Sequence, residues 1–339
     1  MRVYEIVAGS TSLDGLKPAT RPEPTAQARQ ILIKVQAASL NYRDLMVARG
    51  LYFGGAVPAN LVPLSDGAGE VISIGAGVSR FRVGDRVCGT FFRGWHDGRP
   101  PPGHMVAIGA PPADGMLAEL VAIDEQDAVA VPAHLSPEAA ATLPCAAVTA
   151  WRGLIENGRV APGESVLLIG TGGVSMFGLQ FARMAGARTV VISSSDEKLA
   201  HARKLGADVA INYRATPEWD AEVLRQTQGR GVDHVIEVGG AGTLGRSMNA
   251  LAVGGRIQLI GVLTGRGGEP PSPYALLAKQ SSVQGVFVGS RGHFERMNAA
   301  IAAQKLEPVI DRVFGFDEAP AAYRRLEQGL HFGKVVIRL

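Results

Sequence analysis

The centre of the chain alternates short apolar runs with helical patterns. Ser165–Ile169 is long enough for a buried strand and too short for a helix. Apolar residues then recur at helical spacing through Val174–Ala185, and Gly186 ends that predicted helix. Thr189–Ile192 is β-branched and reads as a second strand. The segment is therefore predicted to be a strand, a glycine turn, a helix and a strand.

The same alternation continues for another hundred residues. The further predicted strands are Val209–Asn212, Val232–Val238, Arg256–Ile260 and Val283–Val288, and the helices between them are Asp196–Leu205, Glu218–Gln228 and Leu244–Leu251. Regular alternation of this kind predicts a doubly wound parallel sheet with helices on both faces. A ligand of such a sheet binds outside the carboxyl ends of the strands.

The first third of the chain has a different pattern, with short strands separated by glycine turns and one helical segment, Asn41–Arg49. The predicted strands are Val3–Ile6, Gln30–Ala37, Gly69–Ile74, Arg86–Gly89 and Leu117–Val121. This pattern predicts a small, barrel-like β domain. Ser136–Glu156 is helical in pattern and is interpreted as the crossover between domains.

The tail is predicted to be helical over His293–Gln304 and Glu318–Gly329 and to close with the strand Val335–Arg338. A strand that follows a complete sheet indicates a return to the first domain. The predicted boundaries are therefore residues 1–125 for the β domain, 126–289 for the α/β domain and 290–339 for the return.

Composition narrows the class of protein. A length of 339 residues has room for two domains, and 46% hydrophobic residues can fill their cores. A net charge of +3 is too balanced to indicate nucleic acid or an anionic membrane as partner, and no apolar window could span a bilayer. Two cysteines, Cys88 and Cys145, and no signal-peptide pattern predict a cytoplasmic protein in a reducing compartment.

The glycine turn after the first central strand is the clearest candidate for a binding site. Gly170, Gly172 and Gly173 stand where backbone N–H groups at the start of a helix, including that of Val174, can approach a pyrophosphate. Ser175 occupies the position of the third glycine of the fingerprint, so helix–strand packing must accept a hydroxymethyl group there. The alternative is a tight turn that binds nothing, but the flanking strand and helix favour a dinucleotide.

The end of the second central strand bears on which dinucleotide binds. Proteins that bind NAD place an acidic residue there, against the ribose 2′-hydroxyl. This chain has Ser193, Ser194 and Ser195 instead, and Lys198 follows. Hydroxyls and a nearby cation suit a 2′-phosphate, so NADP(H) is favoured over NAD(H). The alternative is that Ser195 only caps a helix and Lys198 is solvated.

Several motifs together resemble the medium-chain dehydrogenase/reductase superfamily, particularly its zinc-free quinone-oxidoreductase-like branch. They are ASLNYRDLMVARGLY (Ala38–Tyr52), PLSDGAGEVISIGAGV (Pro63–Val78), GDRV (Gly84–Val87), LPCAAVTAW (Leu143–Trp151), GTGGVS (Gly170–Ser175), ARKLGAD (Ala202–Asp208), Ile211–Tyr213 and GKVV (Gly333–Val336). The resemblance implies an α/β protein with a GroES-like β-barrel catalytic domain, a doubly wound Rossmann domain and a cleft between them. It also implies a homodimer formed through an edge strand at Val283–Val288.

The resemblance bears directly on zinc. Zinc-dependent relatives place a cysteine where this chain has Asn41 and a histidine where it has Ser65, and their third ligand matches Cys145. A catalytic zinc needs about three protein ligands, so no metal is expected. Residues 91–114 contain no cysteine, so a structural zinc is not expected either.

Without a metal, hydrogen-bond donors must polarise a substrate carbonyl. The zinc-free relatives resemble this chain in having an asparagine at the position of Asn41 and a tyrosine at the position of Tyr52. These side chains offer an amide donor and a phenol. Asn41 as a helix cap and Tyr52 as a core residue are the alternatives. Arg43 is a weaker candidate, and Asp44 is expected to orient a neighbour or to pair with an arginine. The further cofactor contacts that the resemblance implies are Thr149, Tyr213, Gly261, Val262, Leu263, Phe287, Val288 and Lys334.

These inferences predict a zinc-independent, NADPH-dependent oxidoreductase that transfers hydride to a quinone or an α,β-unsaturated carbonyl. One alternative is an alcohol or ketone dehydrogenase of the same superfamily. Another, of a different class, is a nucleotide-binding or structural protein without turnover. The expected partner is a small carbonyl or quinone substrate.

Overall fold

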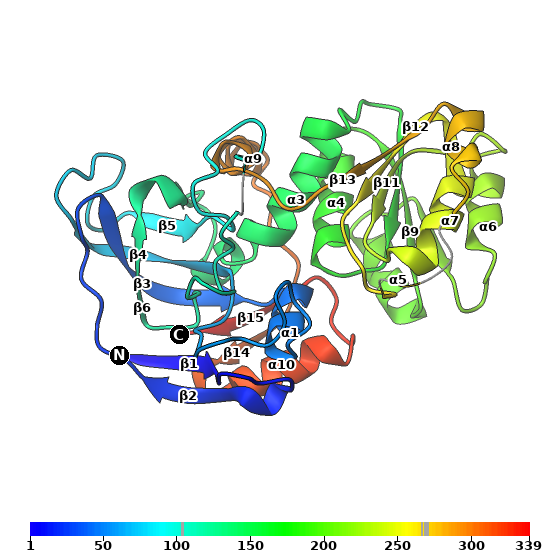
Figure 1. Cartoon of the computed structure of the whole chain (residues 1–339). Helices are drawn as coiled ribbons and strands as arrows, with labels where there is room; N and C mark the ends of the chain where they lie inside the picture. Colours follow the sequence, from blue (N-terminus) through cyan, green and yellow to red (C-terminus); the bar gives the residue numbers. More distant parts are fainter. Residues whose placement is uncertain (103–104, 266, 268–270) are drawn as a thin grey trace. The chain divides into compact units, whose positions relative to one another are not determined.

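The computed structural model describes residues 1–102, 105–265, 267 and 271–339. The chain forms two compact units: Met1–Val148 with Gly289–Leu339, and Thr149–Val288 (Figure 1). The predicted boundary at residue 125 is wrong, because residues 126–148 belong to the first unit. Its strand β7 (Ala128–Ala130) pairs with β5 (Arg86–Gly89), which ties this segment to the first sheet. Residues 103 and 104 of the loop at 91–114 lie outside the described residues.

The first unit is built on one large sheet and a two-stranded ribbon. In the large sheet the order is β14-β15-β3-β4-β5-β7, with β6 also paired to β3, and β1 pairs with β2 in the ribbon. The remaining strands are β1 (Arg2–Ile6), β2 (Leu16–Thr20), β3 (Gln30–Ser39), β4 (Asp66–Ile74), β6 (Leu120–Asp124), β14 (Ile310–Gly315) and β15 (Lys334–Arg338). Its helices are α1 (Tyr42–Ala48), α2 (Pro137–Ala140), α9 (Arg291–Gln304) and α10 (Ala319–Glu327), with 3₁₀ turns at Leu13–Gly15, Glu125–Asp127 and Phe316–Glu318.

The tail of the chain completes this sheet. Strand β15 runs antiparallel to β3, with Val336 opposite Ser39, and β14 pairs with the far side of β15. Figure 1 shows the red β15 beside the blue β3. This pairing brings Lys334, the first residue of β15, to the place where β3 ends and α1 begins.

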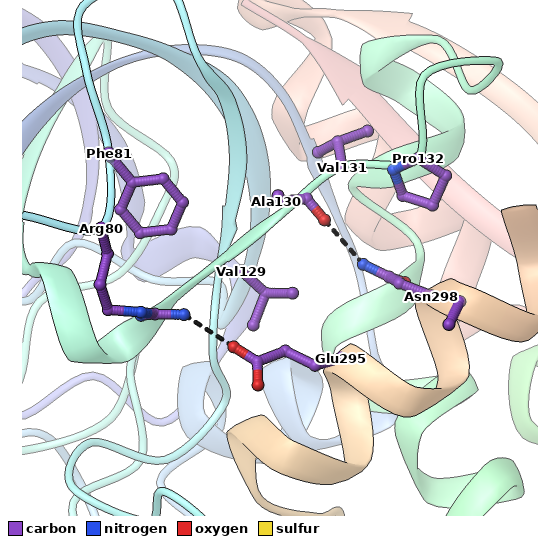
Figure 2. Close-up of a pocket in the computed structure, with 9 residues that line it drawn as sticks. Arg80, Phe81, Val129, Ala130, Val131, Pro132, Glu295 and Asn298 are labelled. Carbon is purple, nitrogen blue, oxygen red and sulfur yellow. Dashed lines mark hydrogen bonds and ion pairs between the residues drawn. The ribbon is translucent and has the colours of Figure 1, made fainter.

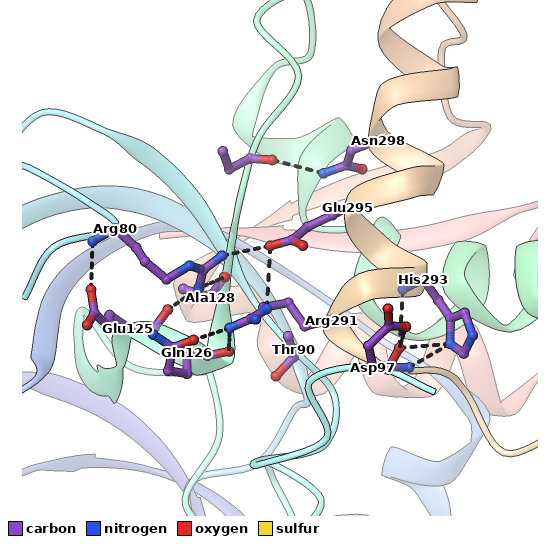
Figure 3. Close-up of polar contacts among 12 residues, drawn as sticks. Arg80, Thr90, Asp97, Glu125, Gln126, Ala128, Arg291, His293, Glu295 and Asn298 are labelled. Carbon is purple, nitrogen blue, oxygen red and sulfur yellow. Dashed lines mark hydrogen bonds and ion pairs between the residues drawn. The ribbon is translucent and has the colours of Figure 1, made fainter. Parts of the chain in front are cut away.

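The outer edge of the sheet, strand β7, is covered by side chains. Asn298 Nδ2 of α9 donates to the carbonyl of Ala130 at 2.9 Å (Figure 2). Arg80 Nη1 donates to the carbonyl of Ala128 at 3.0 Å (Figure 3). Arg80 also pairs with Glu295 of α9 at 2.7 Å, and Arg291 approaches the same carboxylate at 3.5 Å (Figure 3). These contacts fix α9 along the edge and satisfy carbonyls that face away from β5.

The second unit is a six-stranded parallel sheet in the order β10-β9-β8-β11-β12-β13. The strands are β8 (Ser165–Ile169), β9 (Arg188–Ser193), β10 (Val209–Asn212), β11 (Val232–Glu237), β12 (Leu251–Leu259) and β13 (Ser282–Gly285). The helices are α4 (Gly173–Met184), α5 (Asp196–Lys204), α6 (Trp219–Gln226), α7 (Ala241–Ala250) and α8 (Tyr274–Lys279). This strand order is that of a dinucleotide-binding Rossmann domain.

Successive side chains of β8 point to opposite faces of the sheet and are apolar on both, which explains why helices cover both faces. Leu167 and Ile169 join a buried cluster that includes Trp219 of α6. Leu168 points to the opposite face, against α4, where a Cβ on Gly178 would lie only 2.7 Å from its Cδ2. Glycine at 178 therefore allows the helix to approach the strand closely.

Some elements differ from the sequence predictions. The single helix predicted over Ser136–Glu156 is divided into α2, a π-helical segment Leu143–Ala147, α3 (Val148–Trp151) and a second π-helical segment Arg152–Asn157. Strand β13 ends at Gly285, before the predicted Val288. The sequence pattern also missed β2, β7, β14 and α8, which are short or contain alternating polar residues. Within the described parts of the chain, no helix has the length and apolar character needed to cross a membrane.

Candidate active site

The first site is built around Asn41, which begins helix α1. Its backbone is extended, with φ −128° and ψ 158°, as expected of a residue that caps a helix. Asp44, three residues on, accepts the backbone N–H of Asn41 at 2.7 Å. This geometry corresponds to the alternative given for Asn41, a residue that caps a helix, and it agrees with the expectation that Asp44 orients a neighbour.

The side chain of Asn41 is held by Lys334. The Lys334 Nζ donates to Asn41 Oδ1 at 2.5 Å and to the carbonyl of Leu40 at 2.7 Å. The Asn41 Nδ2 is buried and has no hydrogen-bond partner among the described residues. A buried amide donor without an acceptor is costly unless a ligand or water supplies one.

Asp66 supplies the negative charge of this cluster. Its Oδ2 lies 3.6 Å from Lys334 Nζ, and its Oδ1 accepts the Ser65 hydroxyl at 2.7 Å. The backbone N–H of Cys145 also donates to Oδ2, at 3.3 Å. Asp66 is completely buried, as is Ser65, so the ion pair with Lys334 is sheltered from solvent.

Arg43 and Tyr52 form the neighbouring part of the cluster. The Arg43 Nη1 donates to Asp44 Oδ1 at 3.1 Å and to the carbonyls of Ile108 and Gly109. Its guanidinium lies 4.7 Å from the centre of the Tyr52 ring, a cation–π distance. The Tyr52 hydroxyl is buried and has no acceptor among the described residues, and Arg43, which has only donors, lies close enough to interact with its oxygen.

Burial changes the proton equilibria of two of these groups. It raises the pKa of Tyr52 above its usual 10, and the Arg43 guanidinium only partly opposes that shift. The phenol therefore stays protonated near neutral pH and can donate. Burial also raises the pKa of Asp44 to about 6, against the opposing effects of Arg43 and of the Asn41 N–H.

The donor set does not fit a zinc ion. Asn41, Ser65 and Cys145 occupy the positions of the three ligands, and burial raises the pKa of the Cys145 thiol, which disfavours the thiolate that zinc requires. The Lys334 ammonium already contacts Asn41 Oδ1 and faces Asp66. Among the described residues, no three His, Cys, Asp or Glu side chains gather as a metal site would need.

The second site lies at the carboxyl end of β8 in the other unit. Gly170 follows the strand with a φ of +79°, a conformation that favours glycine, and Gly172 caps α4. Because Gly172 has no side chain, it cannot itself bond the first N–H groups of α4. These N–H groups, at Gly173 and Val174, therefore suit an anionic pyrophosphate.

Ser175 is accommodated where the fingerprint has its third glycine. Its hydroxyl donates to the carbonyl of Ile169 at 2.7 Å, and the side chain is buried. The hydroxymethyl group thus ties the helix to the end of β8 instead of obstructing their packing. The close approach that the third glycine usually permits is made here by Gly178.

The serine run lies at the end of β9. Ser193 ends the strand and is buried, and Ser195 caps α5 by accepting the backbone N–H of Lys198 at 3.3 Å. The nearest acid, Asp196, instead accepts the side-chain amide of Asn212 at 2.9 Å. No carboxylate therefore ends β9, as the sequence indicated, and Ser194 is partly exposed beside Ser193.

The other predicted cofactor residues of this unit lie in or beside its loops. Tyr213 follows β10, bonds through its N–H to the Ser193 carbonyl and is 39% exposed. Gly261, Val262 and Leu263 follow β12, and Thr149 is buried in α3. Phe287 is exposed and Val288 is buried, with the Val288 carbonyl accepting Arg152 Nη1 at 3.2 Å. Lys334 differs from these residues because it belongs to the first unit.

Two family models match the chain. Residues 27–133 match the alcohol dehydrogenase GroES-like domain, and residues 173–303 match the zinc-binding dehydrogenase domain. A zinc-type alcohol dehydrogenase-like protein of Schizosaccharomyces pombe is 42% identical over 99% of this chain and 98% of its own length. The chain belongs to the medium-chain dehydrogenase/reductase superfamily.

Two further similarities extend this result. A 2-methylene-furan-3-one reductase of Solanum lycopersicum is 32% identical over 93% of this dehydrogenase/reductase and 73% of its own length. A solved structure of an NAD-dependent alcohol dehydrogenase is 30% identical, with a TM-score of 0.91 over the whole of both chains. The predicted GroES-like and Rossmann folds are confirmed, and the protein is an NAD(P)-dependent oxidoreductase.

Sequence reasoning missed two features of the first site. It did not anticipate that the Lys334 ammonium donates to Leu40 and Asn41, and the predicted contact of Lys334 with the cofactor stays a prediction. It also missed Tyr323 of α10, whose buried hydroxyl has no hydrogen-bond partner among the described residues and lies close enough to Asp44 for that charge to raise its pKa further. Only the pairing of β15 with β3, which no local pattern encodes, could have indicated the first contact.

Proposed function

We propose that this dehydrogenase/reductase reduces α,β-unsaturated carbonyls or quinones with NADPH and without a metal. The observation that carries the proposal is the pair of buried donors, Asn41 Nδ2 and the Tyr52 hydroxyl, which have no acceptor among the described residues. An oxygen on which negative charge develops would supply that acceptor. Donors held in a buried site stabilise such charge strongly.

The reduced nicotinamide supplies hydride when it is bound. The residues proposed to hold the dinucleotide are Thr149, Gly170, Gly172, Gly173, Val174, Ser193, Ser194, Ser195, Lys198, Tyr213, Gly261, Val262, Leu263, Phe287 and Val288. The glycine turn suits the pyrophosphate, and the absence of a carboxylate at the end of β9 supports NADP over NAD.

Asn41 and Tyr52 differ in what they can provide. The Asn41 amide donates a hydrogen bond and keeps its proton. The Tyr52 phenol can donate a hydrogen bond or deliver a proton to the reduced substrate. Because burial raises its pKa, the phenol remains protonated near neutral pH and holds the proton that this step requires.

The test is NADPH oxidation by EDTA-treated enzyme with a panel of enones and quinones, accompanied by elemental analysis. Turnover that is unaffected by the chelator is expected. Absence of turnover with the whole panel, together with activity restored by zinc, would refute the proposal.

An alcohol or ketone dehydrogenase is the second candidate function, since the relatives include a zinc-type alcohol dehydrogenase-like protein and an NAD-dependent alcohol dehydrogenase. Stoichiometric zinc in the purified protein and oxidation of alcohols with NAD would favour it. Zinc-free protein that reduces enones would favour the first candidate.

We also propose that the protein forms a homodimer through the edge at residues 283–288. Strand β13 is the last strand of the second sheet, and among the described residues only β12 pairs with it. The Val286 N–H donates to Leu259 of the neighbouring strand, so the N–H of Gly285, one residue earlier, faces the free edge. Light scattering on the wild type and on Gly285→Pro tests the proposal, because proline removes that donor from the edge. A monomeric wild type would contradict the proposal.

A further inference from the structure

We propose that Lys334 is a positioning residue that fixes the orientation of the Asn41 side-chain amide and so aims Asn41 Nδ2 at the substrate oxygen. The inference rests on the proposed function for the substrate, but the orientation itself rests on contacts within the first unit. An amide presents an acceptor on one side and a donor on the other, and the two orientations have almost the same shape.

The chemistry of Lys334 selects one of these orientations. An ammonium has three donors and no acceptor, and Nζ lies 2.5 Å from the amide atom of Asn41 that it contacts. If the amide were rotated by 180°, two donors would face each other at this distance. The oxygen of Asn41 must therefore point to Lys334, and the NH₂ group must point away from it.

The ammonium is itself fixed from two other sides. It donates to the carbonyl of Leu40 at 2.7 Å and lies 3.6 Å from the carboxylate of Asp66. Lys334 is only 2% exposed, so solvent does not compete for it. The hydrogen bonds of Lys334 are thus made within the first unit. They favour a role in positioning Asn41 rather than the contact with the cofactor that the sequence predicted.

The backbone of Asn41 is held separately from its side chain. Asp44 accepts the Asn41 N–H at 2.7 Å and would continue to do so if Lys334 were replaced. Removal of Lys334 should therefore leave Asn41 in place as a helix cap and free only its amide to rotate. This separation makes the positioning role testable.

The experiment compares Lys334→Met, which removes every donor, with Lys334→Gln, which keeps donors but loses the charge. Each substitution is also combined with Asn41→Ala. We expect Lys334→Met to lower kcat for enone reduction by about 10²-fold, the scale of a misplaced group, with the Kd of NADPH unchanged. Lys334→Gln should recover part of the loss. In the Asn41→Ala background, Lys334→Met should lower kcat no further.

A readout independent of turnover is the side-chain amide resonance of Asn41 in protein labelled with ¹⁵N-asparagine. Its assignment comes from its loss in Asn41→Ala. We expect it to shift in Lys334→Met and less in Lys334→Gln. Should Lys334→Met fail to fold, Lys334→Gln alone gives the comparison.

Three results would overturn the inference. The first is an Asn41 amide resonance that Lys334→Met leaves unchanged. The second is a weakened Kd of NADPH with unchanged kcat at saturation, which would assign Lys334 to the cofactor. The third is a double variant in which Lys334→Met lowers kcat by a further factor beyond the loss caused by Asn41→Ala. If the wild type reduces no enone or quinone, the proposed function fails, and the amide resonance still decides the role of Lys334.

Discussion

The two oxygens of the Asp44 carboxylate serve two different neighbours: Oδ2 accepts the backbone N–H of Asn41 at 2.7 Å, and Oδ1 pairs with the Arg43 guanidinium at 3.1 Å. Asp44 is completely buried. One side chain therefore joins the residue that begins α1 to the cation that packs on Tyr52. The charge of Asp44 should control both of the proposed donors.

The first prediction concerns the pH dependence of turnover. Because burial raises the pKa of Asp44 to about 6, the carboxylate becomes neutral below that pH and its ion pair with Arg43 is lost. We expect kcat to fall on the acid side with an apparent pKa near 6. The pH profile of Asp44→Asn, which keeps an acceptor for Asn41, should lack this limb. An identical acid limb in Asp44→Asn would assign it to another group.

The same shift predicts a pH dependence of stability. The pKa of Asp44 is about 6 in the folded protein, against the ordinary value of 3.8 that applies to the unfolded chain. Between these two pH values the folded state therefore binds more protons than the unfolded state. The free energy of unfolding should therefore decrease as the pH rises from about 4 to 6, by on the order of 3 kcal/mol. Urea unfolding of the wild type and of Asp44→Asn measures the difference. A wild-type stability that rises more steeply than that of Asp44→Asn would contradict the sign.

The third prediction concerns the proposed donors. Asn41→Asp keeps the shape of the side chain and its contact with Lys334 but removes the Nδ2 donor, and Tyr52→Phe removes only the hydroxyl. Each should lower kcat by about 10²-fold, as loss of one donor to a developing oxyanion does. Tyr274→Phe is the matched control, because Tyr274 is 75% exposed in the other unit. Unchanged turnover in both donor variants would remove these residues from the mechanism.

Much of the fold could be predicted because several central strands are short runs rich in apolar residues. Ser165–Ile169 and Val209–Asn212 have the bounds that the pattern gave. Strand β7 could not be predicted in the same way, since its three residues acquire their conformation from pairing with β5. Ser195 was assigned correctly as a helix cap because its capping bond is local.

The candidate site follows the same division between local and distant contacts. The pairing of Asp44 with a nearby arginine joins adjacent residues and could be anticipated. The contact between Lys334 and Asn41 spans 293 positions of the sequence and depends on the register of β15 against β3. Such a contact is a property of the sheet topology, so periodicity within a segment does not reveal it.

The fourth prediction concerns cofactor preference. Lys198→Gln should raise the KM for NADPH by about 10-fold, the worth of one charge-assisted hydrogen bond, and leave the KM for NADH unchanged. Lys204→Gln, an exposed position on the same helix, is the matched control. Equal effects of Lys198→Gln on both cofactors would show that Lys198 does not contact a 2′-phosphate.

The fifth prediction concerns the outer edge of the first sheet. Asn298→Leu removes the donor to the Ala130 carbonyl while keeping a similar volume, and it should lower the free energy of unfolding by about 1–3 kcal/mol. It should also increase concentration-dependent association, because an uncovered strand edge can pair with another chain. Gln304→Leu, at the exposed end of the same helix, adds the same side chain without uncovering β7. Equal behaviour of the two variants would contradict this role of Asn298.

The position of Lys334 in the chain has a consequence for biosynthesis. Asn41 and Asp66 are synthesised before the ammonium that orders them, which follows Asn41 by 293 positions. Until β15 joins β3, a nascent chain can bury Asp66 only without its cation, and the Asn41 amide is free to rotate. The dinucleotide-binding unit, by contrast, is complete at residue 288. The protein should thus gain its capacity to bind a cofactor before Lys334 is synthesised, and its capacity to direct the reaction only after β15 has joined β3.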